Sequence, residues 1–232
     1  MKILGLIPAR GGSKGVPRKN IKLLHKKPLI EYSIESALKC NLIDKVVVST
    51  DDKEIAAISV AAGADVPFMR PEELSTDQAP SIGLVIHALN YFREKGENFD
   101  AVCLLQPTVP YRSSEDLKSA IEKFQNGNFD SLVTVREVPH IYNPYWTFQE
   151  DDKTGTIRKV ISDPQLIVRR QELPTIYHRD GSVYVSSSDA ILNKHSLYGS
   201  ATGFYVMTSS PNVNIDTMED WEIAEKVKFN NN

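Results

Sequence analysis

The stretch IPARGGSKGVPRKN, residues 7–20, combines three glycines with four cationic side chains directly after an apolar run. Its cations are Arg10, Lys14, Arg18 and Lys19. Glycines let backbone N–H groups approach phosphate oxygens closely, and lysine and arginine supply the opposite charge. The stretch has neither the GxxxxGKS/T pattern of a Walker loop nor the GxGxxG pattern of a dinucleotide fingerprint. We therefore predict a phosphate-binding loop of another kind, with a solvated basic turn as the alternative.

The elements around this loop alternate between strand and helix. Short apolar or β-branched runs predict strands at residues 2–8, 44–50, 101–105, 131–135 and 203–207. Helical spacing of apolar residues predicts helices at residues 28–40, 51–62, 81–95, 114–125 and 218–228. Such alternation indicates a parallel sheet with helices on both faces, whose ligands bind at the carboxyl ends of the strands. The loop at residues 7–20 follows the first strand and lies at that edge.

Between residues 136 and 187 the alternation lapses into a segment rich in Pro, Tyr and Arg. We predict one domain over residues 1–232 that carries an inserted lobe at about residues 137–187. The lobe contains Tyr142, Tyr145, Trp146 and Tyr177. Aromatic residues in an irregular insertion indicate its small core or a subunit interface more often than a ligand box.

Composition excludes several classes of protein. The chain has 27 basic and 30 acidic residues and a net charge of -3, which argues against a nucleic-acid partner. No apolar run approaches the roughly 20 residues that span a membrane, and residues 1–3 lead into a strand and not a secretory signal. The two cysteines are too few for a disulfide framework or a thiolate metal site. We expect a cytoplasmic protein with reduced thiols and no membrane partner.

Five blocks of the sequence resemble the acylneuraminate cytidylyltransferases, which join CMP to nine-carbon sugar acids such as sialic or legionaminic acid. The blocks are IPARGGSKGVPRKN, STDDKEIAAISVAAGADVPFMRPEELSTDQAPS, LLQPTVPYR, RRQELPTIYHRDGSVYV and NIDTMEDWEIAE, and they follow the order of the family. The resemblance implies a Rossmann-like, glycosyltransferase-A-like nucleotidyltransferase, a three-layer α/β sandwich with a mostly parallel sheet. It also implies that the inserted lobe forms a homodimer and lends residues to the partner's site.

The resemblance assigns a nucleotide site for CTP. It implies nucleotide binding by Arg10, Gly11, Gly12, Ser13, Lys14, Lys19, Asn20, Arg70 and Ser81. In this assignment Arg10, Ser13, Lys14 and Lys19 face the triphosphate, while Arg70 and Ser81 read the base edge of cytosine. Taken alone, Asn20 could merely support a turn, and Arg70 could form a surface salt bridge.

The resemblance also assigns an acceptor site. Gln106 can donate to and accept from sugar or ribose hydroxyls, although QPTVP could be only a structural turn. The sugar acid carries a carboxylate, and its binding group is implied to be Arg169, Arg170, Gln171 and Tyr177. Three residues depart from the usual motifs: Val109, Tyr111 and Asp180. Asp180 could adapt the site to another sugar substituent or could pair with Arg179.

The last block has a consequence for the metal. In the family, the two aspartates of a usual DID motif supply ligands for Mg²⁺. Here Asn214 stands at the position of the first aspartate, and Asp216 at the position of the second. Asn214 can still coordinate through its amide oxygen, and Asp220 is a further candidate. The alternative is a structural role, in which Asp216 or Thr217 caps the last helix.

The implied reaction is attack of the acceptor's anomeric 2-hydroxyl on the α-phosphorus of CTP, with Arg10, Lys19, Gln106 and Asp216 as the catalytic set. One alternative keeps this chemistry with 3-deoxy-manno-octulosonic acid or a phosphonate as acceptor. The other is a catalytically weak nucleotide-binding relative, because Asn214 and Asp180 depart from the family pattern.

Overall fold

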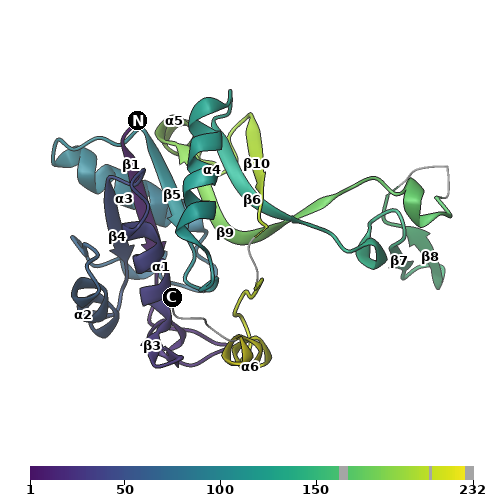
Figure 1. The fold of residues 1–232 in the computed structure, drawn as a ribbon, viewed down its shortest axis with the longest axis horizontal. Helices are drawn as coiled ribbons and strands as arrows, with labels where there is room; N and C mark the ends of the chain where they lie inside the picture. Colours follow the sequence, from purple (N-terminus) through teal and green to yellow (C-terminus); the bar gives the residue numbers. More distant parts are fainter. Residues whose placement is uncertain (162–166, 209–210, 228–232) are drawn as a thin grey trace. The chain divides into compact units, whose positions relative to one another are not determined.

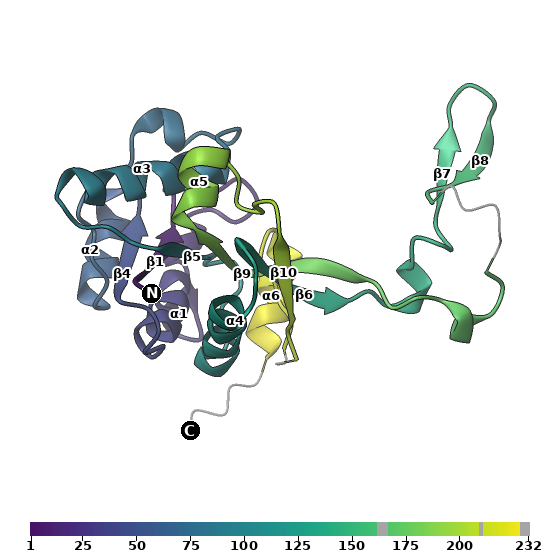
Figure 2. The same cartoon turned by 90° about the horizontal axis from the view of Figure 1, so that it is seen from above.

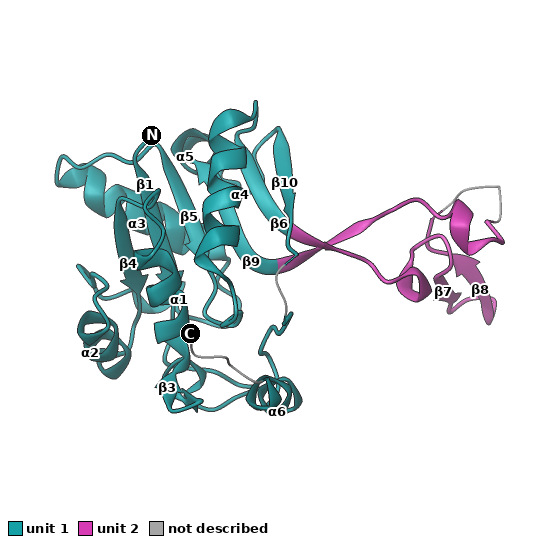
Figure 3. Cartoon of the chain, viewed as in Figure 1, with its two compact units in different colours: residues 1–134, 181–232 teal, residues 135–180 magenta. Residues whose placement is uncertain are grey.

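The computed structural model describes residues 1–161, 167–208 and 211–227. The chain divides into two compact units, residues 1–134 with 181–232 and residues 135–180 (Figure 3). The second unit corresponds to the predicted insertion, but the predicted end at about residue 187 is wrong. Residues 183–187 pair with a strand of the first unit, because Val183 and Val185 are fully buried in its core.

The first unit is built on a six-stranded sheet with the order β10-β6-β9-β5-β1-β4 (Figure 1). Its strands are β1 (Ile3–Pro8), β4 (Lys45–Ser49), β5 (Ala101–Leu105), β6 (Ser131–Glu137), β9 (Tyr177–Ser187) and β10 (Thr202–Val206). The strands β4, β1 and β5 run parallel, and β9 runs antiparallel to β5. The apolar residues of β1 and β5 are buried, as expected for strands covered on both faces.

Helices cover both faces of this sheet, so the predicted three-layer α/β architecture is confirmed. The helices are α1 (Leu29–Leu38), α2 (Lys53–Ala61), α3 (Ser81–Glu94), α4 (Ser114–Asn126), α5 (Ser188–Lys194) and α6 (Met218–Lys226). Seen from above, α3 and α5 lie on one face and α1 and α4 on the other (Figure 2). The predicted helix at residues 218–228 ends at Lys226, and residue 228 lies outside the described residues.

Smaller elements had no counterpart in the sequence prediction. They are the hairpin strands β2 (Leu23–Leu24) and β3 (Lys27–Pro28), the hairpin strands β7 (Phe148–Asp151) and β8 (Thr156–Lys159), and the helix α5. Four 3-10 turns complete the described fold: η1 (Lys19–Ile21), η2 (Glu72–Leu74), η3 (His140–Tyr142) and η4 (Arg170–Glu172). The four short strands, of two or four residues, hold too few side chains to produce a recognisable hydrophobic period.

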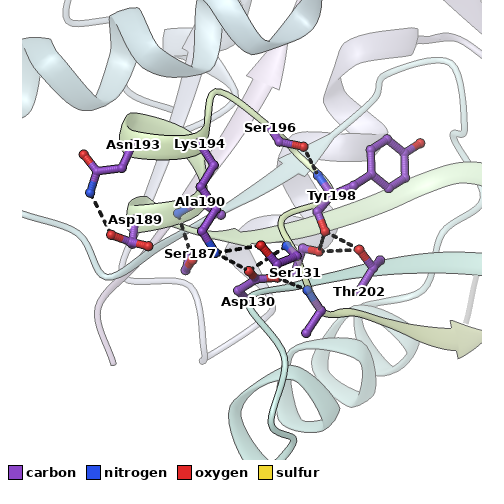
Figure 4. A network of polar contacts seen from close by, with 12 residues as sticks. Asp130, Ser131, Ser187, Asp189, Ala190, Asn193, Lys194, Ser196, Tyr198 and Thr202 are labelled. Carbon is purple, nitrogen blue, oxygen red and sulfur yellow. Dashed lines mark hydrogen bonds and ion pairs between the residues drawn. The ribbon is translucent and has the colours of Figure 1, made fainter.

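A polar network around Asp130 stabilises the edge of the sheet at which β10 lies (Figure 4). The Asp130 carboxylate accepts from Lys194 Nζ at 2.8 Å, from Ser200 N at 2.7 Å and from Ala201 N at 2.9 Å. These contacts hold the pKa of Asp130 at about 2, with the Lys194 bond as the largest cause. Gly199 has a φ of 60°, and a Cβ there would overlap the Asp130 carboxylate, so glycine is required.

In the part of the chain that the structure describes, every helix is too short or too polar to cross a bilayer. Both cysteines, Cys40 and Cys103, are buried free thiols.

Candidate active site

The carboxyl ends of β1 and β5 open into a pocket of about 300 Å³. The pocket is lined by Pro8, Arg10, Ser13, Lys14, Gly15, Lys19, Asn20, Ser81, Gln106, Pro107, Thr108 and Asp216. Eight of these were predicted as site residues: Arg10, Ser13, Lys14, Lys19, Asn20, Ser81, Gln106 and Asp216. The fold therefore brings together residues from both ends of the sequence, and it does so at the edge where an open α/β sheet binds ligands.

The loop after β1 has a conformation that depends on glycine. A Cβ on Gly15 would overlap the carbonyl oxygen of Asp216, so the loop and the segment before α6 pack backbone to backbone. The Gly11 N–H donates to the carboxylate of Asp51 at 2.9 Å. The side-chain amide of Asn20, which is buried, donates to the carbonyl of Arg10 at 2.9 Å. Asn20 thus supports the turn of the loop, as the alternative from the sequence had it, while also lining the pocket.

Lys19 connects the loop to the segment before α6. Its ammonium donates to the carbonyl of Ile215 at 2.7 Å and lies 3.3 Å from Asp216 Oδ1. Only 13% of the Lys19 side chain is exposed. A lysine held this way presents its charge to the pocket from a defined position and not as a free surface cation.

Arg18 does not belong to this charge cluster, in contrast to the prediction from the sequence. Its guanidinium pairs with Asp52 and lies 2.6 Å from Glu54, at the start of α2. Asp52 is the N-cap of α2 and accepts from the N–H groups of Glu54 and Ile55. The arginine therefore anchors the outer side of the loop to a helix terminus, because the acids that open α2 are its nearest opposite charges.

Arg10 and Lys14 share a carboxylate that no sequence motif singles out. Asp77 lies 2.6 Å from Arg10 Nη1 through one oxygen and pairs with Lys14 through the other. Lys14 and then Arg10 lower the pKa of Asp77 by hydrogen bonding to it. Asp77 belongs to the turn between η2 and α3, a segment whose polar composition resembles that of any surface loop.

The N-terminus of α3 also faces the pocket. Ser81 is the first residue of this helix and lines the pocket, and the first turn of α3 contains no acidic residue. Pro80 precedes it and offers no side-chain cap. The open N–H groups and the positive end of the helix dipole therefore favour an anion at this place.

Arg70 is buried and is not among the residues that line the pocket. Its Nε donates to Ser49 Oγ at 3.0 Å, and its Nη2 donates to the carbonyl of Ser49. Burial lowers the pKa of Arg70 to about 10, so the side chain remains cationic at neutral pH. The surface salt bridge considered from the sequence is therefore wrong, and the base-reading role stays a prediction.

Gln106 and Thr108 form the wall contributed by the β5 loop. The Thr108 carbonyl accepts from Ile215 N at 2.8 Å, which fastens this wall to the segment before α6. Val109 and Tyr111, which depart from the family motif, are both buried. Tyr111 donates to the carbonyl of Ala224 at 2.6 Å and packs against α6, and neither Tyr111 nor Val109 lines the pocket.

The residues considered for metal binding separate into two groups. Asp220 Oδ2 accepts from Asp216 N at 3.0 Å and from Thr217 N at 2.8 Å, and Thr217 is the N-cap of α6 in a capping box with Asp220. Asp220 is therefore committed to the helix, and the cap is Thr217 and not Asp216. The Asp216 side chain is 64% exposed and faces the pocket, with Asn214 Nδ2 donating to it at 3.2 Å.

This donor set suits Mg²⁺ that arrives on a nucleotide. Among the described residues, no cluster of three or more His, Cys, Asp or Glu side chains could hold a metal by itself. Mg²⁺ in nucleotide sites is bound through one or two carboxylates, with phosphate oxygens and waters completing an octahedron. Asp216 and the amide oxygen of Asn214 fit that pattern.

The predicted acceptor residues Arg169, Arg170, Gln171 and Tyr177 all lie in the second unit and are exposed. Arg170 lines a pocket of about 330 Å³ within this unit, together with His140 and Glu137. Arg169 lies 3.6 Å from Glu172.

Asp180 is buried in the second unit. Its Oδ2 lies 3.5 Å from Arg136 Nε, so Asp180 forms an ion pair with β6. The two readings of Asp180 from the sequence stay predictions. Arg136 was not among the partners predicted for Asp180 from the sequence.

The first unit is an α/β sandwich with a cationic, glycine-rich loop after its first strand, opposed by a carboxylate from the last part of the chain. This arrangement is compatible with a nucleotidyltransferase. The comparisons with known proteins narrow the class. The family model described as cytidylyltransferase matches residues 4–231. The chain belongs to this cytidylyltransferase family, as the sequence analysis expected.

Two curated relatives cover almost the whole chain. A CMP-N,N'-diacetyllegionaminic acid synthase of Legionella pneumophila is 39% identical over 98% of this chain and 96% of its own length. A pseudaminic acid cytidylyltransferase of Campylobacter jejuni is 35% identical over 97% of this chain and 95% of its own length. Among solved structures, a CMP:2-keto-3-deoxy-manno-octonic acid synthetase complexed with CTP has a TM-score of 0.71 at 18% identity and covers 97% of both chains. That structure supports the fold.

Proposed function

We propose that this protein transfers CMP from CTP to the anomeric 2-hydroxyl of a nine-carbon 2-keto sugar acid and releases pyrophosphate. The observation that carries the proposal is the pocket in which Arg10, Lys14 and Lys19 meet Gln106 and Asp216. The chain's membership of the cytidylyltransferase family supports the nucleotide, and two relatives named for nine-carbon sugar acids support the class of acceptor.

In this mechanism the loop after β1 binds the triphosphate. Arg10 and Lys14 bind the outer phosphates. The backbone N–H groups at Gly12 and Ser13 and the N-terminus of α3 add further donors, and these donors lose no side-chain entropy when the phosphates bind. Lys19 is held at the floor of the pocket, where its charge stabilises the pentavalent α-phosphorus. Phosphoryl transfer depends mainly on such positioning and charge neutralisation.

Asp216 and Asn214 would hold Mg²⁺, which would supply positive charge to neutralise the charge that develops on the phosphates. Lys19 already neutralises Asp216 in the structure, at 3.3 Å. We infer that Lys19 turns from Asp216 toward the phosphates when the nucleotide binds. Arg70 and Ser81 are proposed to read the base, with Gln106 oriented to the ribose or the acceptor by the rigid Pro107 that follows it.

We further propose that the active form is a homodimer in which the second unit contributes to the acceptor site. That unit exposes apolar side chains that a monomer would leave in water: Ile141, Tyr142, Phe148, Ile157, Val160, Val168 and Tyr177. Exposed apolar patches of this kind mark subunit interfaces. Arg169, Arg170, Gln171 and Tyr177 then bind the carboxylate and hydroxyls of the acceptor. Sedimentation at micromolar concentration is expected to give a dimer, and a fully active monomer at nanomolar concentration would contradict this part of the proposal.

The two buried free thiols favour the cytoplasm as the compartment, because an oxidising environment would select for disulfides. We expect no nucleic-acid partner, since the net charge is -3.

The experiment that tests the proposal is a pyrophosphate-release assay with CTP, Mg²⁺ and a panel of acceptors. The panel contains sialic, legionaminic and pseudaminic acids, with 3-deoxy-manno-octulosonic acid as an eight-carbon comparison. We expect turnover with at least one nine-carbon acid, and none with ATP in place of CTP. Preference for the eight-carbon acid would replace the acceptor class, and absence of turnover with every acceptor would favour a catalytically weak relative.

Arg10→Ala tests the pocket within the same assay. Loss of the Arg10 guanidinium should raise the KM for CTP and lower kcat, because charge complementary to the phosphates is removed from the pocket. Arg93→Ala is the matched control; this residue lies on the last turn of α3, away from the pocket lining, and its loss should leave both constants unchanged. Equal kinetics for the two variants would remove Arg10 from the site.

A further inference from the structure

Asp77 occupies the position that the proposed function gives to phosphate. Its two carboxylate oxygens each take one cation: Oδ1 lies 2.6 Å from Arg10 Nη1, and Oδ2 pairs with Lys14 Nζ. Arg10 and Lys14 are both pocket residues. Two oxygens on one atom, each facing a different cation, reproduce the way in which a phosphate group would bridge the same two side chains.

Among the residues that the structure describes, Asp77 is the one acid that forms an ion pair with Arg10 or with Lys14. The Lys14 side chain is 84% exposed and the Asp77 side chain 38% exposed. Ion pairs at such exposure contribute little to folding stability, so holding the fold together does not explain this contact.

The turn that carries Asp77 is also only lightly attached. Residues 75–80 connect η2 to α3, and their backbone contacts are local: Ala79 N donates to Thr76 O at 3.3 Å, and Ser75 N donates to Glu72 O at 2.9 Å. Asp77 can therefore leave the two cations without breaking a strand pair or a helix.

We propose that Asp77 is an internal competitor of the anions that bind to Arg10 and Lys14 in the loop after β1. The inference rests on the proposed function only for the identity of the natural ligand. An anion that binds to Arg10 and Lys14 at these positions must displace Asp77 or lie beside its carboxylate, where repulsion between like charges weakens the binding. A triphosphate offers several charged groups to displace Asp77, whereas orthophosphate or a nucleoside monophosphate offers one.

The same competition acts after the reaction. When CMP has been transferred, Asp77 can return to Arg10 and Lys14 and compete with the pyrophosphate that remains. The Asp77 carboxylate thereby assists the release of pyrophosphate. Its contact with Arg10 and Lys14 stabilises the pyrophosphate-free state of the loop and so shifts the population toward that state.

The test measures anion binding to Asp77→Asn by calorimetry, with tripolyphosphate, orthophosphate and cytidine as probes. The substituted asparagine keeps the shape of the side chain but loses its charge. We expect tripolyphosphate and orthophosphate each to bind about three- to tenfold more tightly than to the wild type, the range expected when one or two exposed ion pairs no longer oppose binding. The affinity for cytidine should stay unchanged, because the nucleoside does not reach Arg10 or Lys14.

Glu73→Gln is the matched control. It removes one negative charge four residues before Asp77, from an exposed side chain in η2, the 3-10 turn that precedes this connection. A specific competitor predicts no gain for Glu73→Gln, whereas a general field effect predicts equal gains for both variants and overturns the inference. Unchanged or weaker tripolyphosphate binding by Asp77→Asn also overturns it, since Asp77 would then merely hold the cations in place.

The anion probes keep this test separate from the test of the proposed function. If the protein fails to use CTP while Asp77→Asn gains affinity for tripolyphosphate, the proposed function is wrong and the competitor role remains. If CTP is used normally and no anion binds more tightly, the competitor role is wrong and the proposed function remains.

Discussion

Asp216 and Asp220 lie four residues apart, and the structure gives them different tasks that one matched pair of substitutions can separate. Asp220 Oδ2 accepts from Asp216 N, Thr217 N and Thr217 Oγ1, at 3.0, 2.8 and 3.0 Å. The Asp216 side chain lies 3.3 Å from Lys19 and 3.2 Å from Asn214, and 64% of it is exposed. Asp216→Asn should therefore affect activity, and Asp220→Asn should affect stability.

The expected magnitudes follow from these contacts. In Asp220→Asn the new amide oxygen can still accept hydrogen bonds, but the variant loses the charge that about doubles their strength and that interacts with the α6 dipole, for a cost of about 1 kcal/mol. In a chain of this size that lowers Tm by about 2–4 °C. Asp216→Asn should change the free energy of unfolding by less than about 0.5 kcal/mol. Its turnover should fall by about a hundredfold or more, because a carboxylate that holds Mg²⁺, as proposed for Asp216, would contribute several kcal/mol to stabilising the transition state.

The pH dependence of the free energy of unfolding gives an independent check on the structural role of Asp220. The hydrogen bond from Asp216 N, followed by those from Thr217, lowers the pKa of Asp220. The stabilisation is therefore complete above the ordinary carboxyl pKa of about 4 and is lost as the pH falls through the lowered value. The stability difference between wild type and Asp220→Asn should shrink below about pH 4.

The assay is thermal unfolding in parallel with a Mg²⁺ titration of pyrophosphate release, for both variants. Asp220→Asn should show a normal Mg²⁺ response at a temperature where it is folded. If Asp216→Asn instead lost stability and kept its Mg²⁺ response, Asp216 would be a structural residue, and its assignment to the metal would be wrong.

Three further predictions follow from the same structure. Asn214→Asp should lower the Mg²⁺ concentration for half-maximal rate, because a second negative charge strengthens a hard-cation site; an unchanged or higher requirement would exclude Asn214 from the metal. Gly15→Ala should lower kcat/KM for CTP by about a hundredfold through displacement of the loop, since a Cβ there overlaps the Asp216 carbonyl, and wild-type kinetics would show that the loop adapts. Asp130→Asn should reduce the free energy of unfolding by about 1–3 kcal/mol at pH 7. The difference in this free energy between wild type and variant should shrink as the pH falls from about 4 toward the Asp130 pKa of about 2. A difference that does not depend on pH would indicate altered packing instead.

The sequence predicted the alternating strands and helices well, because each long element has its own hydrophobic period. Strand β5 has the predicted bounds of residues 101–105, and α3 and α4 differ from their predicted ends by one residue. The cationic, glycine-rich loop after β1 could be located from the sequence for a related reason. Its glycines and cations are contiguous, so the chemistry of Arg10, Lys14 and Lys19 is visible without knowledge of the fold.

The sequence did not predict where the insertion ends or which acids face the loop. The run after Gly181 is a strand of the main sheet because Val183 and Val185 find a buried place beside β5, which is a long-range contact. Asp77 lies within the second block of the family resemblance, which assigned it no role, and its partners Arg10 and Lys14 are far away in the chain.

Several alternatives that the sequence left open were decided by tertiary contacts. Thr217, Asp216 and Asp220 are all chemically able to cap α6, and only the backbone geometry at its first turn selects Thr217 with Asp220. Arg18 and Lys19 are adjacent cations, yet Arg18 turns outward to Asp52 while Lys19 turns inward to Ile215. Residue type determines what chemistry a side chain can perform. Whether it performs that chemistry depends on which distant donors and acceptors the folded backbone places within hydrogen-bonding reach, because those interactions fall off within a few ångströms.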